Sequence, residues 1–197
     1  MSRAPVVVRS AVPQDASALL EVWPLTRTDA ASSGDATDAP AEARTREASA
    51  CIAQIATDPE EELLVADSDG VVMGAVHLRR ARLSPVQLAE AVQVSHLQVH
   101  PRHRRRGIAS ALLAAATAWA EAKDSAHLLA VAPSSSREAH RFLAKLGFGQ
   151  VGVVRACSTA ALRHRFATAA VSVSSDTSRL LATRRTLRRR REQLAAS

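Results

Sequence analysis

The residues best suited to bind an anion stand in the stretch HPRHRRRGIASALL, from His100 to Leu113. Arg102 and the arginines at 104–106 precede Gly107 and an apolar, alanine-rich run. The first amides of a helix are unpaired and carry about half a unit of positive charge, so arginines there disfavour the helix itself. A phosphate offsets that cost, because glycine lets the backbone approach it and arginines donate charged hydrogen bonds to it. The stretch therefore predicts a phosphate- or pyrophosphate-binding turn at the start of a helix.

A strand must end and a helix must begin around this turn. The segment EAVQVSHLQVH, residues 90–100, alternates apolar and polar side chains. It predicts a strand that ends at Pro101, which has no amide to donate to a sheet. After Gly107, an apolar stripe at spacings of three and four predicts a helix with one face on a core. The members of that stripe are Ile108, Leu112, Ala116 and Trp119.

Three further elements precede the strand. The segment VVVRSAVPQDASALLEVW, residues 6–23, predicts a short strand, a turn and a helix with Asp15 as its N-cap. A polar loop from Thr26 to Pro40 leads to a second helix over Ala41 to Ala56. The segment EELLVADSDGVVMGAVHLRRARL, residues 61–83, predicts a hairpin with DSDG at its turn.

The segments after the arginine turn predict a strand at AHLLAVA and a helix at SSSREAHRFLAKLGF. Ser135 and Glu138 have the spacing of a capping box at the start of that helix. Two weak apolar runs between Gly149 and Phe166 predict strands that close the sheet. The order predicts an α/β fold, a mixed sheet of about six or seven strands with helices on both faces.

Composition indicates a globular protein with a core of its own, because the chain has 197 residues and 47% apolar content. The longest apolar run, from Ile108 to Ala120, is too short and too rich in alanine to cross a bilayer. The first ten residues lack the apolar centre of a secretory signal. Cys51 and Cys157 lack metal or redox spacing, and we expect both to be reduced. We expect a cytoplasmic protein without a membrane partner.

The basic charge is concentrated in the last thirty residues. Residues 168–197 hold seven arginines against Asp176 and Glu192, which accounts for +5 of the net charge of +7. A narrow apolar seam with a spacing of seven runs through them at Leu180, Leu187 and Leu194. We predict a folded domain over residues 1–167 and an Arg-rich tail over 168–197. We expect a solvated basic tail; docking on its own domain, on a second copy as a homodimer, or on nucleic-acid phosphates stays open as an alternative.

Arg104, Gly107 and Ala109 follow the pattern Gln/Arg-x-x-Gly-x-Gly/Ala, which resembles the acetyl-CoA signature of the GNAT superfamily of N-acetyltransferases. The opening strand and helix, the hairpin and the segment 126–152 are similar to further parts of that family, so the resemblance spans residues 5–167. It implies the family's mixed α/β fold, acetyl-CoA as cosubstrate and acetyl transfer to an amine. The implied cofactor-binding residues are Leu97, Val99, His103, Arg104, Arg105, Arg106, Gly107, Ile108, Ala109 and Ser136.

The positions that correspond to the family's catalytic groups differ from the usual residues. The tyrosine that protonates the thiolate in many members corresponds to Leu143, and this chain contains no tyrosine. The usual glutamate base corresponds to Ser95, with His96 beside it. Strand alternation places His96 on the opposite face from Ser95 unless a bulge intervenes. The resemblance implies Ser95 and His96 as catalytic candidates, with His96 as the base, and Trp23 and Arg27 as acceptor-binding residues.

No metal site is expected at His96, His100 and His103, because the neighbouring arginines repel a cation and no carboxylate lies among them. The sequence predicts an acetyl-CoA-dependent N-acetyltransferase that acts on a small-molecule or peptide amine. Two alternatives stay open: a catalytically silent acyl-CoA-binding module, and a nucleic-acid-associated protein that acts through residues 168–197.

Overall fold

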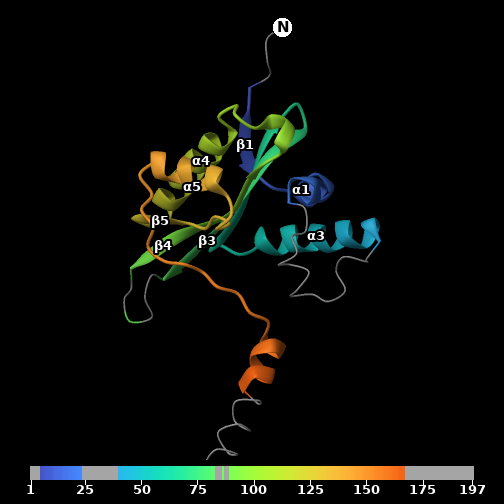
Figure 1. Ribbon diagram of the computed structural model, residues 1–197. Helices are drawn as coiled ribbons and strands as arrows, with labels where there is room; N and C mark the ends of the chain where they lie inside the picture. The colour runs from blue at the N-terminus through green and yellow to red at the C-terminus, as the bar shows by residue number, and fades with distance from the viewer. Residues whose placement is uncertain (1–4, 24–39, 83–85, 87–88, 167–197) are drawn as a thin grey trace, which may run out of the picture. The chain divides into compact units, whose positions relative to one another are not determined.

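The computed structural model describes residues 5–23, 40–82, 86 and 89–166. The chain divides into two units, Met1–Gln150 and Val151–Ser197. The first unit contains a five-stranded sheet in the order β1-β2-β3-β4-β5 (Figure 1). The strands are β1 (Val7–Ser10), β2 (Glu61–Ser68), β3 (Val71–Arg82), β4 (Glu90–Val99) and β5 (His127–Ala130). Only β4 and β5 pair in parallel, so the sheet is mixed, as predicted.

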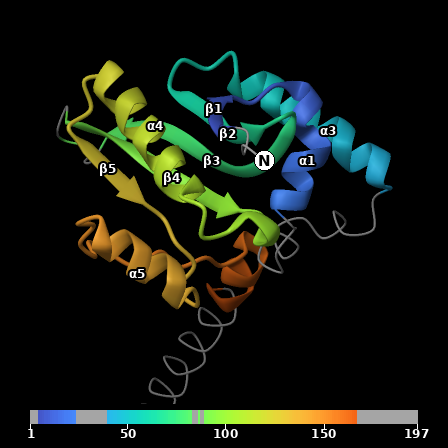
Figure 2. The ribbon, with the colours of Figure 1, turned by 90° about the horizontal axis from the view of Figure 1, so that it is seen from above.

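Helices cover both faces of this sheet (Figure 2). They are α1 (Ala16–Val22), α3 (Ala41–Ile55), α4 (Ile108–Ala122) and α5 (Arg137–Lys145), with short 3-10 turns at η1 (Pro13–Asp15) and η2 (Pro101–His103). One core cluster, on the α1/α3 face, contains Leu19, Ile52, Leu63 and Val65. A second cluster, on the α4/α5 face, contains Leu78, Val92, Ile108 and Leu112. The predicted helices on both faces are confirmed.

Strand β4 extends beyond its pairing with β5. The register runs from Ala91 opposite His127 to Val94 opposite Ala130, and the amide of Val131 donates to the carbonyl of Val94 at 2.9 Å. β4 then continues to Val99 beside β3, so among the described residues no strand pairs with its other edge there. The end of β4 is therefore an open strand edge, beside which an extended segment can lie.

The first turn of α4 packs tightly against the sheet at Gly74 of β3. A Cβ atom at Gly74 would lie 2.9 Å from the carbonyl oxygen of Gln98 and 3.1 Å from Cγ2 of Ile108. A larger residue would push the start of α4 away from β4, because backbone cannot yield as a flexible side chain does. Gly74 thus sets how closely the helix N-terminus approaches the end of β4.

Asp15 precedes α1 as predicted, but its side chain does not cap that helix. The carboxylate accepts the amide of Val12 at 2.8 Å and two guanidinium nitrogens of Arg9 at 2.7 and 2.9 Å. Arg9 also donates to Asp67 of β2 at 3.2 Å. The hydrogen bond from Arg9 holds the pKa of Asp15 below its ordinary value, and the same bond raises the pKa of Arg9. These bonds join β1 and β2 to the start of α1.

The N-terminus of α5 lies one residue later than the predicted capping box. Ser136 is the N-cap, and its hydroxyl accepts the amide of Ala139 at 3.3 Å. Ser135 lies inside a turn closed by the amide of Ser136, which donates to the carbonyl of Pro133 at 2.9 Å. Ala139 therefore takes the third helical position in place of Glu138, and the predicted pairing of Ser135 with Glu138 is wrong.

The described sheet has five strands instead of the predicted six or seven. Residues 151–158 have no regular structure and residues 159–166 are helical, so the predicted closing strands between Gly149 and Phe166 are wrong. Two glycines, at 149 and 152, weaken any strand there, and the alanine-, leucine- and arginine-rich segment that follows favours a helix. The Arg-rich tail, residues 168–197, lies outside the described residues.

Candidate active site

A groove of about 380 Å³ opens where β4 and β5 separate. Its walls come from the end of β4, the chain after β5, the first turn of α4 and the first half of α5. Eight of the ten predicted cofactor-binding residues line it together. They are Leu97, Val99, Arg104, Arg105, Gly107, Ile108, Ala109 and Ser136. An extended ligand can lie along this edge of β4 because no described strand pairs with it there.

The loop that enters α4 has the conformation of an anion site. Gly107, the N-cap of α4, has φ 79°, and Arg105, two residues earlier, has φ 61°. Left-handed residues in a tight turn direct successive amides into one concavity, which suits an oxyanion. The amide of Ala111 donates to the carbonyl of Gly107 at 2.9 Å, so the three preceding amides of α4 come before the first helical bond.

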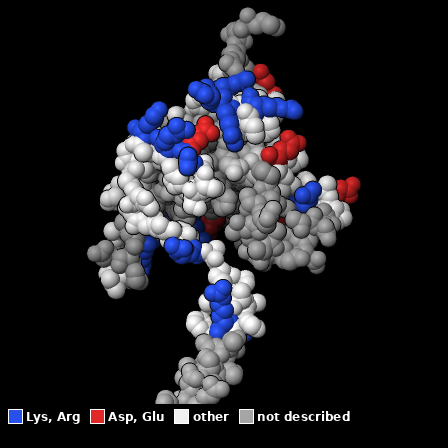
Figure 3. Space-filling model, in the orientation of Figure 1, with Lys and Arg blue, Asp and Glu red and all other residues white. Residues whose placement is uncertain are grey.

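The arginines of this loop divide into two groups. Arg104 and Arg105 line the groove, and Nη1 of Arg104 lies 4.0 Å from the carboxylate of Glu138. The predicted residues His103 and Arg106 do not line the groove; Nη1 of Arg106 lies 3.4 Å from Nδ1 of His103. Figure 3 shows basic side chains gathered at the top of the view, with acidic groups among them. A diphosphate at Gly107 would therefore meet mostly positive charge, with Glu138 opposing it.

Two further groove residues bear on the departures from the family pattern. The Ser136 hydroxyl caps α5, so the helix-start function of this residue is present, while its side chain also lines the groove. Leu143 lines the groove and packs against the core of the α4/α5 face. The position of the usual tyrosine thus carries only an aliphatic side chain.

A β-bulge in β4 determines where His96 lies. Ala75 pairs with Gln98 and His77 with Ser95, so two residues of β4 oppose one residue of β3. His96 has φ 53°, and its Nδ1 lies 3.2 Å from the hydroxyl of Ser95. The bulge therefore removes the alternation that separates the two side chains in a regular strand, which is the exception that the sequence analysis allowed for.

Trp23, at the end of α1, reaches this bulge from the α1/α3 face. Its indole N–H donates to the carbonyl of His96 at 2.7 Å, and the two rings meet edge to face with centroids 5.9 Å apart. Its ring also packs against the core of that face. Trp23 therefore both fills the core and fixes the His96 backbone. Arg27, the other predicted acceptor-binding residue, lies outside the described residues.

Two polar residues that the sequence analysis did not select lie behind Ser95. Nδ1 of His77 lies 3.1 Å from the Ser95 hydroxyl, and Nε2 of His77 lies 3.2 Å from Oε2 of Glu61. The other oxygen of Glu61 lies 3.4 Å from Nε of Arg79. These contacts come from three neighbouring strands. The pairing of the two strands in the predicted hairpin could have indicated them. In that pairing His77 lies opposite Leu63, two residues from Glu61.

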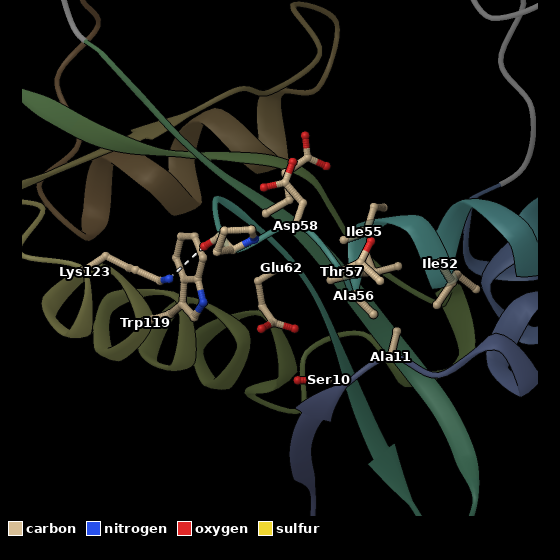
Figure 4. Close-up of a pocket in the computed structure, with 13 residues that line it drawn as sticks. Ser10, Ala11, Ile52, Ile55, Ala56, Thr57, Asp58, Glu62, Trp119 and Lys123 are labelled. Carbon is tan, nitrogen blue, oxygen red and sulfur yellow. Dashed lines mark hydrogen bonds between the residues drawn. The ribbon is translucent and has the colours of Figure 1, made fainter.

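A second cavity, also about 380 Å³, lies between the C-terminal ends of α3 and α4 (Figure 4). Lys123 donates to the carbonyl of Pro59 at 2.7 Å and sits 5.6 Å from the ring centre of Trp119. Glu62 also lines this cavity. None of the predicted site residues lies in it.

No group of three or more metal-ligating side chains forms within residues 5–23, 40–82, 86 and 89–166. His100 and His103 lie near each other, with ring centres 5.6 Å apart. The same part of the chain contains no helix that is long and apolar enough to span a membrane.

A family model described as "Acetyltransferase (GNAT) family" matches residues 27–148, more than half of the chain. The matched segment includes the end of β4, the arginine loop, α4 and α5. Acetyl-CoA is the acetyl donor in this family, and solved neighbours contain CoA or a CoA analogue. A sequence search of curated proteins finds no match.

Solved structures share the fold. A transcriptional regulator from Bacillus halodurans C-125 has a TM-score of 0.65 at 18% identity, over 78% of this chain and 99% of its own. A ribosomal-protein-alanine N-acetyltransferase from Brucella melitensis biovar Abortus 2308 has a TM-score of 0.55 at 22% identity, with coverage of 78% and 99%. An aminoglycoside N-acetyltransferase in complex with CoA has a TM-score of 0.61 at 17% identity, over 80% of this chain and 97% of its own.

Proposed function

The chain belongs to the GNAT acetyltransferase family, and we propose that it transfers an acetyl group from acetyl-CoA directly to a primary amine. The observation that carries this proposal is the groove between β4 and β5. It includes the amide-rich loop at Gly107, and it includes Leu97, the neighbour of His96. The groups that would bind phosphate, at Gly107, and the group that would take a proton, His96, therefore lie apart from each other near the end of β4.

Acetyl-CoA would bind with its pyrophosphate on the amides that follow Gly107. Arg104 and Arg105 supply charge-assisted hydrogen bonds at the rim. The pantetheine arm would lie against the unpaired edge of β4, along Leu97 and Val99. Ile108, Ala109 and Ser136 would form the remaining contacts, while His103 and Arg106, which lie off the groove lining, stay predictions.

The acceptor amine would approach from the side of Trp23 and His96. An alkylamine has a pKa of about 10 and is mostly protonated at neutral pH, so the reaction needs a group that takes a proton. His96 is the candidate base, with Ser95 as its neighbour. The departing thiolate leaves without help from a tyrosine, because Leu143 occupies that position. The acceptor class is a small-molecule or peptide amine.

Two measurements test the proposal. Acetyl-CoA at about 100 times its Kd should stabilise the protein by about 2.7 kcal/mol, seen as a higher Tm. A thiol assay with acetyl-CoA and a diverse panel of amines should then detect free CoA that depends on one class of amine. A thermal shift without thiol release from any amine would favour the catalytically silent module. No thermal shift at all would contradict both.

A further inference from the structure

Glu61, His77, Ser95 and His96 form a continuous chain of hydrogen bonds across three strands. The links are Glu61 Oε2 to His77 Nε2 at 3.2 Å, His77 Nδ1 to Ser95 Oγ at 3.1 Å, and Ser95 Oγ to His96 Nδ1 at 3.2 Å. Each distance is within the range of an ordinary hydrogen bond. The chain starts at the half-buried Glu61 and ends at the exposed His96.

The direction of each hydrogen bond follows from Glu61. Its carboxylate can only accept, and Arg79 stands 3.4 Å from its second oxygen. His77 must then donate from Nε2, and in its neutral form it accepts at Nδ1. The Ser95 hydroxyl donates to that nitrogen, so its oxygen lone pairs are left for His96. His96 therefore carries its proton on Nδ1, and its Nε2 has a lone pair.

From this arrangement we propose that Glu61, His77 and Ser95 are positioning residues that hold His96 in the tautomer whose Nε2 accepts a proton from the acceptor amine. This inference rests on the proposed function. No described residue bonds to His96 Nε2, and Trp23 fixes the His96 backbone, so that nitrogen is left for the acceptor. His96 has a positive φ of 53°, a strained conformation for a residue with a side chain and one that recurs at functional sites.

The proton transfer balances along the chain. The small neutral fraction of the amine, whose first proton has gone to solvent, attacks the thioester carbonyl; a C–N bond forms, and the C–S bond breaks to release the CoA thiolate. The proton lost by the amine goes to Nε2 of His96. Nδ1 of His96 passes its proton to Ser95, and Ser95 passes its own to Nδ1 of His77. The charge then rests on the His77 imidazolium of β3, beside the Glu61 carboxylate of β2.

The first test needs no substrate. Nitrogen-15 NMR of the imidazole rings at neutral pH reports which nitrogen of His96 is protonated. We expect the Nδ1–H tautomer in the unaltered protein, and a shift toward Nε2–H, the form that free imidazole side chains prefer, in Ser95→Ala and in Glu61→Gln. Glu62→Gln is the matched control, because Glu62 is the next residue of β2 and points to the opposite face of the strand.

A His96 tautomer that is the same in the unaltered protein, Ser95→Ala and Glu61→Gln would overturn the proposal. A change of equal size in Glu62→Gln would also overturn it. Because this readout requires no acetyl transfer, its failure is distinguishable from a failure of the proposed function, which the thiol assay reports separately.

The second test is kinetic. Ser95→Ala should lower kcat by about 10- to 100-fold with the KM for acetyl-CoA unchanged, because the groove that binds the cofactor does not include Ser95. Ser95→Thr keeps the hydroxyl and should restore kcat to within about threefold. Gln93→Ala, on the same face of β4, controls for strand packing. Equal losses in Ser95→Ala and Gln93→Ala, or no recovery in Ser95→Thr, would contradict the positioning function.

Discussion

The two sides of the end of β4 are built from different kinds of group. On the α4/α5 face, the groove presents backbone amides near Gly107, aliphatic side chains and two arginines. On the α1/α3 face, side chains from three strands and from the end of α1 meet at Ser95 and His96. The first arrangement can hold a large anionic cofactor, and the second can move a proton.

The two sides also differ in how far apart their residues lie in the sequence. The loop and helix start of the groove lie within about ten consecutive residues, and two residues with left-handed backbone, Arg105 and Gly107, shape their amides. The side with Ser95 and His96 joins residues that are 16 and 18 positions apart, from Glu61 to His77 and from His77 to Ser95. Binding and chemistry should therefore respond separately to substitution.

The largest expected effect separates chemistry from binding at His96. His96→Gln should lower kcat by about 100- to 1,000-fold, because the amine loses its proton acceptor, while the Kd of acetyl-CoA stays within about twofold. Steady-state kinetics and calorimetry check the two values. His127→Gln, an exposed histidine of β5, is the matched control and should leave both unchanged. A His96→Gln protein with full kcat would remove His96 from the mechanism.

The next effect is the converse, a loss of binding at Gly107. Gly107→Asp should weaken CoA binding by about 100-fold or more, because it places a carboxylate at the proposed diphosphate site. Gly70→Asp is the matched control: it has the same charge change and nearly the same backbone angle, φ 77° against 79°, and lies in the β2–β3 turn. Gly107→Asn separates charge from strain and should cost about tenfold or less. Calorimetry that gives equal CoA affinities for both aspartate variants would contradict the phosphate assignment.

A moderate effect concerns the helix that carries Trp23. Asp15→Asn should lower the free energy of unfolding by about 1–2 kcal/mol at neutral pH, because it breaks the partly exposed ion pair with Arg9. The folded pKa of Asp15 lies below the ordinary value of 3.8, so its stabilisation is present above that pH and is lost as the pH falls through the folded pKa.

Urea denaturation of both proteins should therefore show a difference that is constant from about pH 5 to pH 7 and shrinks toward about pH 3. Asp58→Asn, whose carboxylate accepts the amide of Glu60 on an exposed turn, serves as the control. A difference that grows in acid would have the wrong sign for this ion pair.

The smallest effect concerns the charge opposite Arg104. Glu138→Gln should tighten acetyl-CoA binding by about two- to threefold at low salt, because it removes a carboxylate that lines the groove beside Arg104. The gain should fade as salt is added, since both side chains are largely exposed. Glu121→Gln, at the far end of α4, removes the same charge outside the groove. Equal gains in acetyl-CoA affinity in both variants would indicate that the net charge of the protein, and not the position of Glu138 in the groove, causes the effect.

Several elements were accessible from local patterns. The hairpin formed with its turn at Asp69 and Gly70, the helix over Ala41–Ile55 appeared nearly as predicted, and β4 ended at Val99, before Pro101. Gly107 became the N-cap of α4. Each depends on alternation, helical spacing, glycine or proline, which act over a few residues.

Other features were not accessible from local patterns. The N-cap of α5 is Ser136 instead of Ser135, because Ser135 lies inside a backbone turn from Pro133 to Ser136. The expected strands after Gly149 did not form in the described part of the chain. Neighbouring serines have nearly the same intrinsic preference for a cap, and a weak apolar run becomes a strand only where an edge pairs with it.

By itself, the sequence determined the order of the elements from β1 to α5 and the arginine-rich turn in which Gly107 begins α4. Only the tertiary structure decided that His96 turns beside Ser95 and that His77 and Glu61 stand behind them. The physical reason is that side-chain periodicity and glycine act locally, whereas a bulge and a strand register depend on pairing between distant segments, where a shift of one residue moves every side chain to the other face.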